Sequence, residues 1–310
     1  MSIQQWKVTE PYVATKCKLG EGVYYVPERN ELRFLDINSS KLYIIDLNKG
    51  PDSLKEIDTG MPVGVTVDIE GVDSSEIVLA GAKDGVTKFN LKTQKHDYVV
   101  KYWSGAGAEE KTKRMRSNDG AVDTAGRFWV EAFDDPEIGD PSDEGVLFRM
   151  DPDGTLQTMY EKIVIPNGIT WNEQDNTMHL TDTTEKRILS FAYHSKTGDI
   201  SDKKIFYDHS KSGLPGNPDG HTQDSEGNLW QALYGGSRVI RVTPEGKVTG
   251  EVLLPTRNIT CCVFAGTDLF VTSAVEEDPK NNPESAKYAG NLFKVNVGVG
   301  GAPRHKARLS

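Results

Sequence analysis

The chain has 310 residues, of which 36% are hydrophobic and 26% charged, so it carries enough apolar material for a packed core. Its formal net charge of −10 and its lack of a Lys/Arg-rich run exclude a typical nucleic-acid binder, and no apolar stretch reaches the length of a membrane span. The 30 glycines and 15 prolines indicate many tight turns between short strands. This composition favours one all-β domain over residues 1–310.

Six segments along the chain follow one plan of short apolar strands separated by turns rich in Asp, Gly or Asn. They cover residues 27–46, 75–90, 123–150, 172–191, 224–242 and 266–297. The third strand of each segment alternates apolar and polar residues, as half-buried strands do. Repeats of roughly 40–55 residues have the size of propeller blades. The sequence therefore predicts an all-β, six-bladed β-propeller, with residues 6–14 expected to add a closing strand to the last blade.

A residue followed by glycine stands just before the first strand of five repeats. The pairs are Glu21-Gly22, Val63-Gly64, Asp119-Gly120, Asn167-Gly168 and Asp219-Gly220, and residues 259–262 take this place in the sixth repeat. The first strand of each propeller blade lines the central channel, so residues at equivalent positions ring one mouth of that channel. The polar members are therefore expected to converge there, with Asn118 beside Asp119.

Carboxylates that crowd a narrow channel repel one another and stay ionised only beside a compensating cation. Oxygen atoms of Asp, Glu and Asn are the ligands preferred by hard cations such as Ca²⁺, Mg²⁺ and Mn²⁺. Asp-Gly and Asn-Gly are also common turn dipeptides, so a set of ordinary turns is the alternative interpretation. The shared position in successive repeats favours one divalent metal ion in the central channel.

Several motifs resemble those of the gluconolactonase, regucalcin (senescence marker protein) and luciferin-regenerating enzyme family. They are Leu19–Gly22, the R-x-N-D-G…D-x-x-G-R-x-W run of 116–129, Pro166–Gly168 and Pro218–Gly220. The likeness extends from Leu19 to about Ala274 and implies a six-bladed propeller that hydrolyses a sugar (aldono) lactone such as gluconolactone.

The resemblance also implies roles for individual residues. Glu21, Asn167 and Asp219 would bind the metal ion, and Asp219 would also be the catalytic general base or acid. Arg116 and Asn118 would bind the substrate, with Asn118 alternatively completing the metal's coordination. Asp119 would be a carboxylate behind the metal ligands that supports them without binding the metal ion. Calcium is the first choice of metal, with magnesium, manganese, zinc and iron as alternatives.

Two further residues are candidates for the substrate pocket. Glu131 stands where the family has a small residue, and it either faces the mouth or lies between blades and needs a partner such as an arginine. His221 follows Asp219 by two residues, which places both on one face of a strand. It is either a proton shuttle or a hydrogen-bonded packing residue. The acidic segment 134–144 is either a solvated loop or a lid over the mouth.

Other functions and the cellular setting remain open at this point. A phosphotriesterase resembling diisopropyl-fluorophosphatase and a non-catalytic calcium-binding propeller are the alternatives, although Arg116 favours a polyhydroxylated substrate. The expected partner is a small-molecule lactone, with neither nucleic acid nor membrane involved. The three cysteines show no disulfide spacing and residues 1–10 no signal-peptide pattern, which predicts a cytoplasmic protein, either a monomer or a small homo-oligomer.

Overall fold

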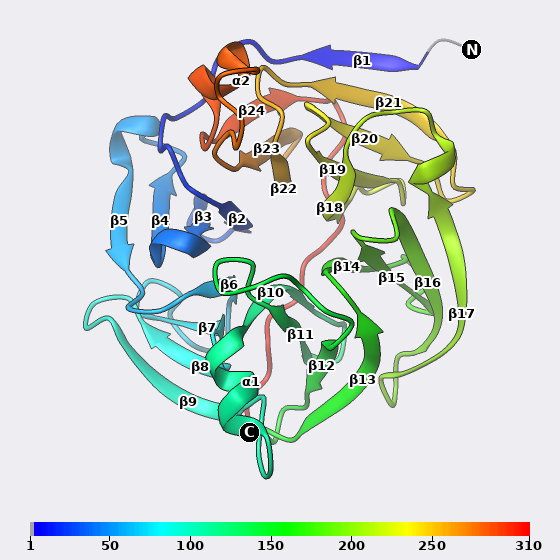
Figure 1. Ribbon diagram of the computed structural model, residues 1–310. Coiled ribbons are helices and arrows are strands. Elements are labelled where there is room, and N and C mark those ends of the chain that lie inside the picture. Colours follow the sequence, from blue (N-terminus) through cyan, green and yellow to red (C-terminus); the bar gives the residue numbers. More distant parts are fainter. Residues whose placement is uncertain (1–2) are drawn as a thin grey trace.

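The computed structural model describes residues 3–310 and contains six β-sheets arranged around a central channel (Figure 1). This architecture is a six-bladed β-propeller, so the predicted fold is confirmed. Hydrophobic clusters lie between neighbouring sheets and fill the space between the blades. Among the described residues, no helix is long and apolar enough to cross a membrane.

The first three blades are four-stranded and are built from consecutive segments. Blade 1 holds β2 (Gly20–Val26), β3 (Glu31–Asp36), β4 (Lys41–Asp46) and β5 (Lys55–Asp58), counted outward from the channel. Blade 2 holds β6 (Val63–Val67), β7 (Ile77–Ala82), β8 (Gly85–Asn90) and β9 (Lys95–Lys101). Blade 3 holds β10 (Met115–Val122), β11 (Phe128–Asp134), β12 (Gly145–Met150) and β13 (Leu156–Ile163).

The other three blades follow in the same order. Blade 4 holds β14 (Pro166–Trp171), β15 (Thr177–Asp182), β16 (Arg187–His194) and β17 (Asp199–Asp208). Blade 5 holds β18 (Asn217–Gln223), β19 (Leu229–Tyr234), β20 (Arg238–Val242) and β21 (Val248–Leu253), and blade 6 holds β22 (Ile259–Ala265), β23 (Asp268–Ser273) and β24 (Phe293–Asn296). The helices are α1 (Ala108–Arg114), α2 (Pro283–Tyr288) and three 3₁₀ turns, η1 (Ile37–Ser39), η2 (Pro51–Ser53) and η3 (His209–Lys211).

The N-terminal strand does not close blade 6 as predicted. Strand β1 (Gln4–Lys7) runs parallel to β21 and becomes the fifth strand of blade 5. The Trp6 ring packs against Trp230 at a centroid distance of 5.3 Å, which anchors the strand there. Beside blade 6 the predicted segment forms no strand, only an isolated bridge between Val13 and Leu292 and a hydrogen bond from Tyr12 N to Leu292 O at 2.8 Å. The expected closing strand was therefore wrong, because the contact of the half-buried Trp6 with the buried Trp230 fixes β1 on the neighbouring blade.

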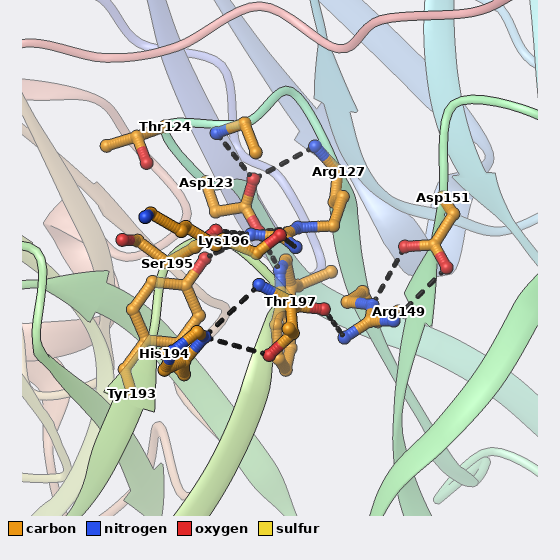
Figure 2. A network of polar contacts seen from close by, with 12 residues as sticks. Asp123, Thr124, Arg127, Arg149, Asp151, Tyr193, His194, Ser195, Lys196 and Thr197 are labelled. Carbon is orange, nitrogen blue, oxygen red and sulfur yellow. Dashed lines mark hydrogen bonds and ion pairs between the residues drawn. The ribbon is translucent and has the colours of Figure 1, made fainter.

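The D-x-x-G-x-x-W repeat forms the same local structure in two blades. In blade 3 the fully buried Asp123 accepts a hydrogen bond from Trp129 Nε1 at 2.9 Å, and in blade 5 Asp224 accepts one from Trp230 Nε1 at 2.8 Å. Asp123 also binds Arg127, whose guanidinium reaches the turn of residues 194–198 in blade 4 (Figure 2). The repeated motif thus fixes the turn after the inner strand in both blades, and in blade 3 its arginine also joins the neighbouring blade.

The C-terminal segment of residues 298–310, called the strap below, crosses the channel on the side away from the viewer (red in Figure 1). It bonds to blade 5 through Ala302 N and Gln223 O at 2.9 Å. It bonds to blade 2 through Ala307, which forms a parallel bridge with Ile69. The strap is therefore held on two opposite parts of the ring.

Candidate active site

All six inner strands carry a one-residue register shift against the second strand of their blade. The shifts fall between Glu21/Tyr24, Val63/Val65, Ser117/Gly120, Asn167/Ile169, Pro218/His221 and Ile259/Cys262. Such bulges bend a strand and redirect its side chains. Gly22 and Gly168 adopt positive φ here, at 54° and 41°, and a Cβ on Gly64 would lie 1.9 Å from Asn118 O. The glycines therefore allow the inner strands to crowd together at one mouth.

The register aligns Asn118, not Asp119, with Asp219. In blade 3 the two residues of the bulge are Asn118 and Asp119, and in blade 5 they are Asp219 and Gly220. The predicted equivalence of Asp119-Gly120 with Asp219-Gly220 was therefore wrong by one residue. It failed because dipeptide similarity cannot tell which residue of a bulge is the extra one. Asn118 accordingly takes the position in blade 3 that Asp219 takes in blade 5.

Glu21, Asn167 and Asp219 are all buried at this mouth, with exposed fractions of 5%, 3% and 7%. Asn167 donates from Nδ2 to Thr183 Oγ1 at 3.2 Å, while its buried Oδ1 has no hydrogen-bond partner among the described residues. Burial, followed by the charge of Asp219, raises the pKa of Glu21 well above its usual range. Burial, followed by the charge of Asp119, does the same to the pKa of Asp219. These are crowded oxygen donors that a cation would stabilise.

The donor set consists of two carboxylates and one amide. Within residues 3–310 there is no group of three or more His, Cys, Asp or Glu side chains that could hold a metal ion. A site made by Glu21, Asn167 and Asp219 has only two such residues and takes its third oxygen from the amide. The unpartnered Asn167 Oδ1 and the crowded carboxylates fit the oxygen preference of a hard divalent ion.

Arg116 and Asn118 form a buried pair beside this set. Arg116 Nη1 donates to Asn118 Oδ1 at 3.1 Å and to Ser117 O at 2.8 Å, and Asn118 Nδ2 donates to Pro166 O at 2.8 Å. Arg116 Nε donates to Asp135 Oδ1 at 3.3 Å. Burial lowers the pKa of Arg116, and the charge of Asp135 opposes that change. The pair is thus fixed in place before any ligand arrives.

Asp119 connects the bulges of blades 3 and 4. Its Oδ1 accepts from Gly120 N at 2.7 Å, and its Oδ2 accepts from Gly168 N at 3.1 Å. Gly168 follows Asn167 directly, so Asp119 holds the backbone that carries the Asn167 side chain. Burial raises the pKa of Asp119. Its position matches a supporting role behind the three oxygen donors.

Glu131 lies fully buried in β11, on the face that carries Trp129 and packs toward blade 4. Its Oε2 accepts from Asp119 N at 3.2 Å, and its buried Oε1 has no partner within the described part of the chain. The residue therefore faces between the blades, yet its partner is a backbone N–H and not the arginine that such a position was expected to need. Burial, followed by the charge of Asp119, raises the pKa of Glu131 well above its usual range.

His221 lies deeper in the channel and has both ring nitrogens occupied. Nε2 pairs with Thr170 Oγ1 at 2.9 Å, and Nδ1 pairs with Thr181 Oγ1 at 2.9 Å. Burial lowers the pKa of His221 to about 3, so the imidazole is neutral near pH 7. These contacts suit the packing role better than the proton-shuttle role.

The acidic segment 134–144 is tied to α1 beside the mouth. Arg114 pairs with Asp134 and, at 2.8 Å, with Glu144. Asp134 and Asp135 are each only 5% exposed, whereas Ile138 is 55% exposed. Asp135 was not predicted, although it follows by two residues the Phe133 that pairs with Arg116 across the sheet. That pairing is visible only in the structure, so the sequence offered no signal for Asp135 beyond the need of a buried arginine for a nearby carboxylate.

The chain matches one family over most of its length and has relatives of similar size. The family model described as "SMP-30/Gluconolactonase/LRE-like region" matches residues 19–275. Pentonolactonase XacC of Haloferax volcanii is 28% identical over 302 residues, covering 95% of this chain and 96% of that protein. Regucalcin of Gallus gallus is 30% identical over 298 residues, covering 92% and 93% of the two chains.

Solved structures share the fold. A calcium-binding protein, regucalcin, from Agrobacterium tumefaciens superposes with a TM-score of 0.87 at 22% identity and covers 99% of both chains. A luciferin-regenerating enzyme superposes with a TM-score of 0.84 at 24% identity, covering 95% of this chain and 96% of the other.

Proposed function

The chain belongs to the SMP-30/gluconolactonase/LRE-like family, and we propose that it hydrolyses the ring ester of a sugar lactone at the buried channel mouth. Lactone hydrolysis as a reaction class is supported by the family and by a pentonolactonase relative that covers nearly the whole chain. The main support for this site is the Arg116–Asn118 pair, which is fixed beside the oxygen donors of Glu21, Asn167 and Asp219.

We infer that one divalent metal ion is bound by Glu21, Asn167 and Asp219. The buried, unpartnered Asn167 Oδ1 and the mutually repelling carboxylates support this set. Calcium is the first choice because all three donors are oxygen atoms. The chemistry that such an ion supplies when bound is polarisation of the lactone carbonyl oxygen.

Residues of the chain transfer the proton and bind the substrate. Asp219 accepts a proton from the attacking water and returns it to the ring oxygen as the acyl C–O bond breaks, which leaves one carboxyl and one hydroxyl group in the product. Arg116 and Asn118 hold the hydroxyl groups of the sugar. Because both are already fixed by hydrogen bonds, little ordering is required when the substrate binds.

The test is lactone hydrolysis by metal-stripped protein with Ca²⁺, Mg²⁺, Mn²⁺, Zn²⁺ or Fe²⁺ restored one at a time. Gluconolactone, five-carbon aldonolactones and a simple γ-lactone form the substrate panel. We expect metal-dependent turnover that Asp219→Asn reduces by roughly 100-fold or more. Asp153→Asn, in an exposed turn of blade 3, is the matched control and should leave turnover unchanged. Turnover that survives both chelation and Asp219→Asn would refute the proposal.

Calcium binding without turnover is the second candidate, because relatives named regucalcin match over nearly the whole chain. It would be supported if the protein bound calcium but hydrolysed no lactone. Diisopropyl fluorophosphate in the same panel tests the phosphotriesterase alternative. Arg116 argues against an apolar phosphotriester, since a buried guanidinium needs hydrogen-bond acceptors.

A further inference from the structure

A second cavity lies at the other end of the central channel. Its volume is about 350 Å³, within the range of small-molecule sites. The strands β10, β14 and β18 carry candidate active-site residues near their first residues and line this cavity with their last ones. The cavity, called the distal chamber below, is therefore separate from the mouth that holds Asp219.

The strap forms the outer wall of this chamber. Its residues 300–302 bond to the blade 5 turn, through Ser225 N to Gly300 O at 2.8 Å and Ala302 N to Gln223 O at 2.9 Å. Further along, Ala307 N donates to Asp68 O at 2.8 Å in blade 2. The residues between these two anchors, 303–306, span the end of the channel and place Arg304 against the chamber.

Within residues 3–310, Arg304 has no carboxylate oxygen within 4.0 Å. Every other arginine except Arg241 lies within 4.0 Å of a carboxylate oxygen in the described part of the chain. The Arg304 guanidinium stacks 4.9 Å from the centre of the Tyr24 ring, and Nη1 donates to Val23 O at 3.4 Å. On its other face Tyr24 meets Arg33, which is already paired with Asp68 at 2.7 Å. The stacking orients Arg304 while most of its N–H donors remain available.

The opposite wall offers groups that suit hydroxyls. Glu173 of blade 4 lines it, and this side chain is exposed, so its carboxylate can accept hydrogen bonds from hydroxyl groups. Trp171, Asn172 and Asp175 lie beside it. The chamber thus has an arginine on the strap side and a hydrogen-bond acceptor on the blade 4 side. An anion alone would leave that second wall unmatched.

We propose that the distal chamber is a second binding site, which takes a small hydroxycarboxylate with its carboxylate on Arg304 and its hydroxyls on blade 4. Arg304 matches a carboxylate because its planar donors can bind both oxygens at once. The ring-opened product of a sugar lactone is a hydroxycarboxylate. The identification of this product as the natural ligand rests on the proposed function. The affinity of the chamber for hydroxycarboxylates does not depend on it.

Isothermal titration calorimetry with D-gluconate tests this assignment, on the protein as purified and again after chelation. Chelation removes any binding that depends on a metal ion at the mouth, so the chamber site should persist in both preparations. D-glucitol lacks the carboxylate and acetate lacks the hydroxyls, and each should bind at least tenfold more weakly. Equal binding of acetate would overturn the assignment of a hydroxy acid.

Two strap variants make the test specific. Arg304→Gln should weaken gluconate binding roughly tenfold or more, as expected when a charged hydrogen bond is lost. Arg308→Gln is the matched control, because Arg308 is exposed on the same strap, pairs with Glu70 at 2.7 Å and does not line the chamber. Melting temperatures confirm that both variants fold. No saturable binding at millimolar gluconate, or equal binding by Arg304→Gln, would overturn the proposal.

Lactone turnover is measured separately on the same samples. Gluconate binding without lactone turnover would leave the chamber assignment standing and refute the proposed reaction. Lactone turnover without gluconate binding in the chamber would support the proposed reaction and refute the chamber assignment.

Discussion

The buried Asp123–Arg127 pair of blade 3 also bonds to blade 4 through the arginine, so the substitution Arg127→Met measures how strongly this contact joins the two blades. Asp123 is fully buried and accepts from Arg127 Nε at 2.6 Å, Trp129 Nε1 at 2.9 Å and Tyr193 OH at 2.8 Å (Figure 2). Arg127 Nη2 also donates to Tyr193 OH at 2.9 Å and to the carbonyl of Ser195. Methionine would keep much of the apolar stem of Arg127 and remove its Nε, Nη1 and Nη2 donors.

The loss should be large because one charge of a buried pair remains. Removing one partner of such a pair typically costs about 3–5 kcal/mol. Asp123 keeps four donors, namely Trp129, Tyr193 and the backbone N–H groups of Ala125 and Arg127, so we expect a loss of about 3 kcal/mol in the free energy of unfolding. With an unfolding entropy near 2.1 cal/mol/K per residue, this corresponds to a fall in Tm of roughly 5 °C.

Arg149→Met is the matched control, measured by urea and thermal unfolding alongside Arg127→Met. Arg149 donates to Thr197 O of the same turn at 3.0 Å, but its carboxylate partner Asp151 is 21% exposed and can be hydrated. We expect this variant to lose only about 1 kcal/mol. Equal losses in the two variants would refute the reasoning that burial of Asp123 sets the magnitude. Lactone turnover per folded molecule should not change in either, since neither residue belongs to the mouth.

Three further outcomes can be checked with single substitutions. Arg116→Lys should lower kcat/KM for an aldonolactone by roughly 10- to 100-fold, because lysine cannot keep the bonds to Ser117 O and Asn118 together. The loss should be smaller for a γ-lactone without hydroxyls, and an equal loss for both would contradict a hydroxyl-binding role. Burial lowers the pKa of His179 to about 4, so the neutral form is the stable one in the fold. Stability should therefore be lost as the pH falls from about 6.5 to about 4, by roughly 3 kcal/mol in urea unfolding, and His179→Leu should abolish that part of the pH dependence. Glu131→Gln should match or exceed the wild type in stability at pH 8, because burial raises the pKa of the Glu131 carboxyl and an amide oxygen can still accept from Asp119 N. The advantage should grow as the pH rises above about 4.3, and a loss of about 2 kcal/mol or more would contradict it.

The repeats predicted the propeller because, apart from β1 in blade 5, each blade is made from one continuous stretch of chain. Alternation along the strands and the spaced turns are local patterns, and they persist in the sheets that form. The partner of β1 could not be predicted in this way. Its choice of blade 5 depends on the contact between Trp6 and Trp230, and strand periodicity does not encode which edge a strand joins.

The residues of the mouth were found from the residue–glycine pairs, but their relative positions were not. The pairs locate the bulges, whereas the one-residue offset that aligns Asn118 with Asp219 depends on pairing across the sheet. Asp135 was not predicted because its contact with Arg116 also depends on pairing across the sheet. Arg304 had no signal at all, because the position of the strap depends on bonds to turns more than 70 residues away in the chain.

The placement of the strap has a consequence for how the ring assembles. Each blade pairs strands that are close in the chain, so each can form as its own segment becomes available, and such local contacts form quickly. Strand β1 must wait for blade 5. The strap comes last, since Ala307, Arg308 and Ser310 bond to turns of blades 2 and 3 that were made long before. During synthesis the ring therefore stays unsealed on that side until residues 300–310 have been made.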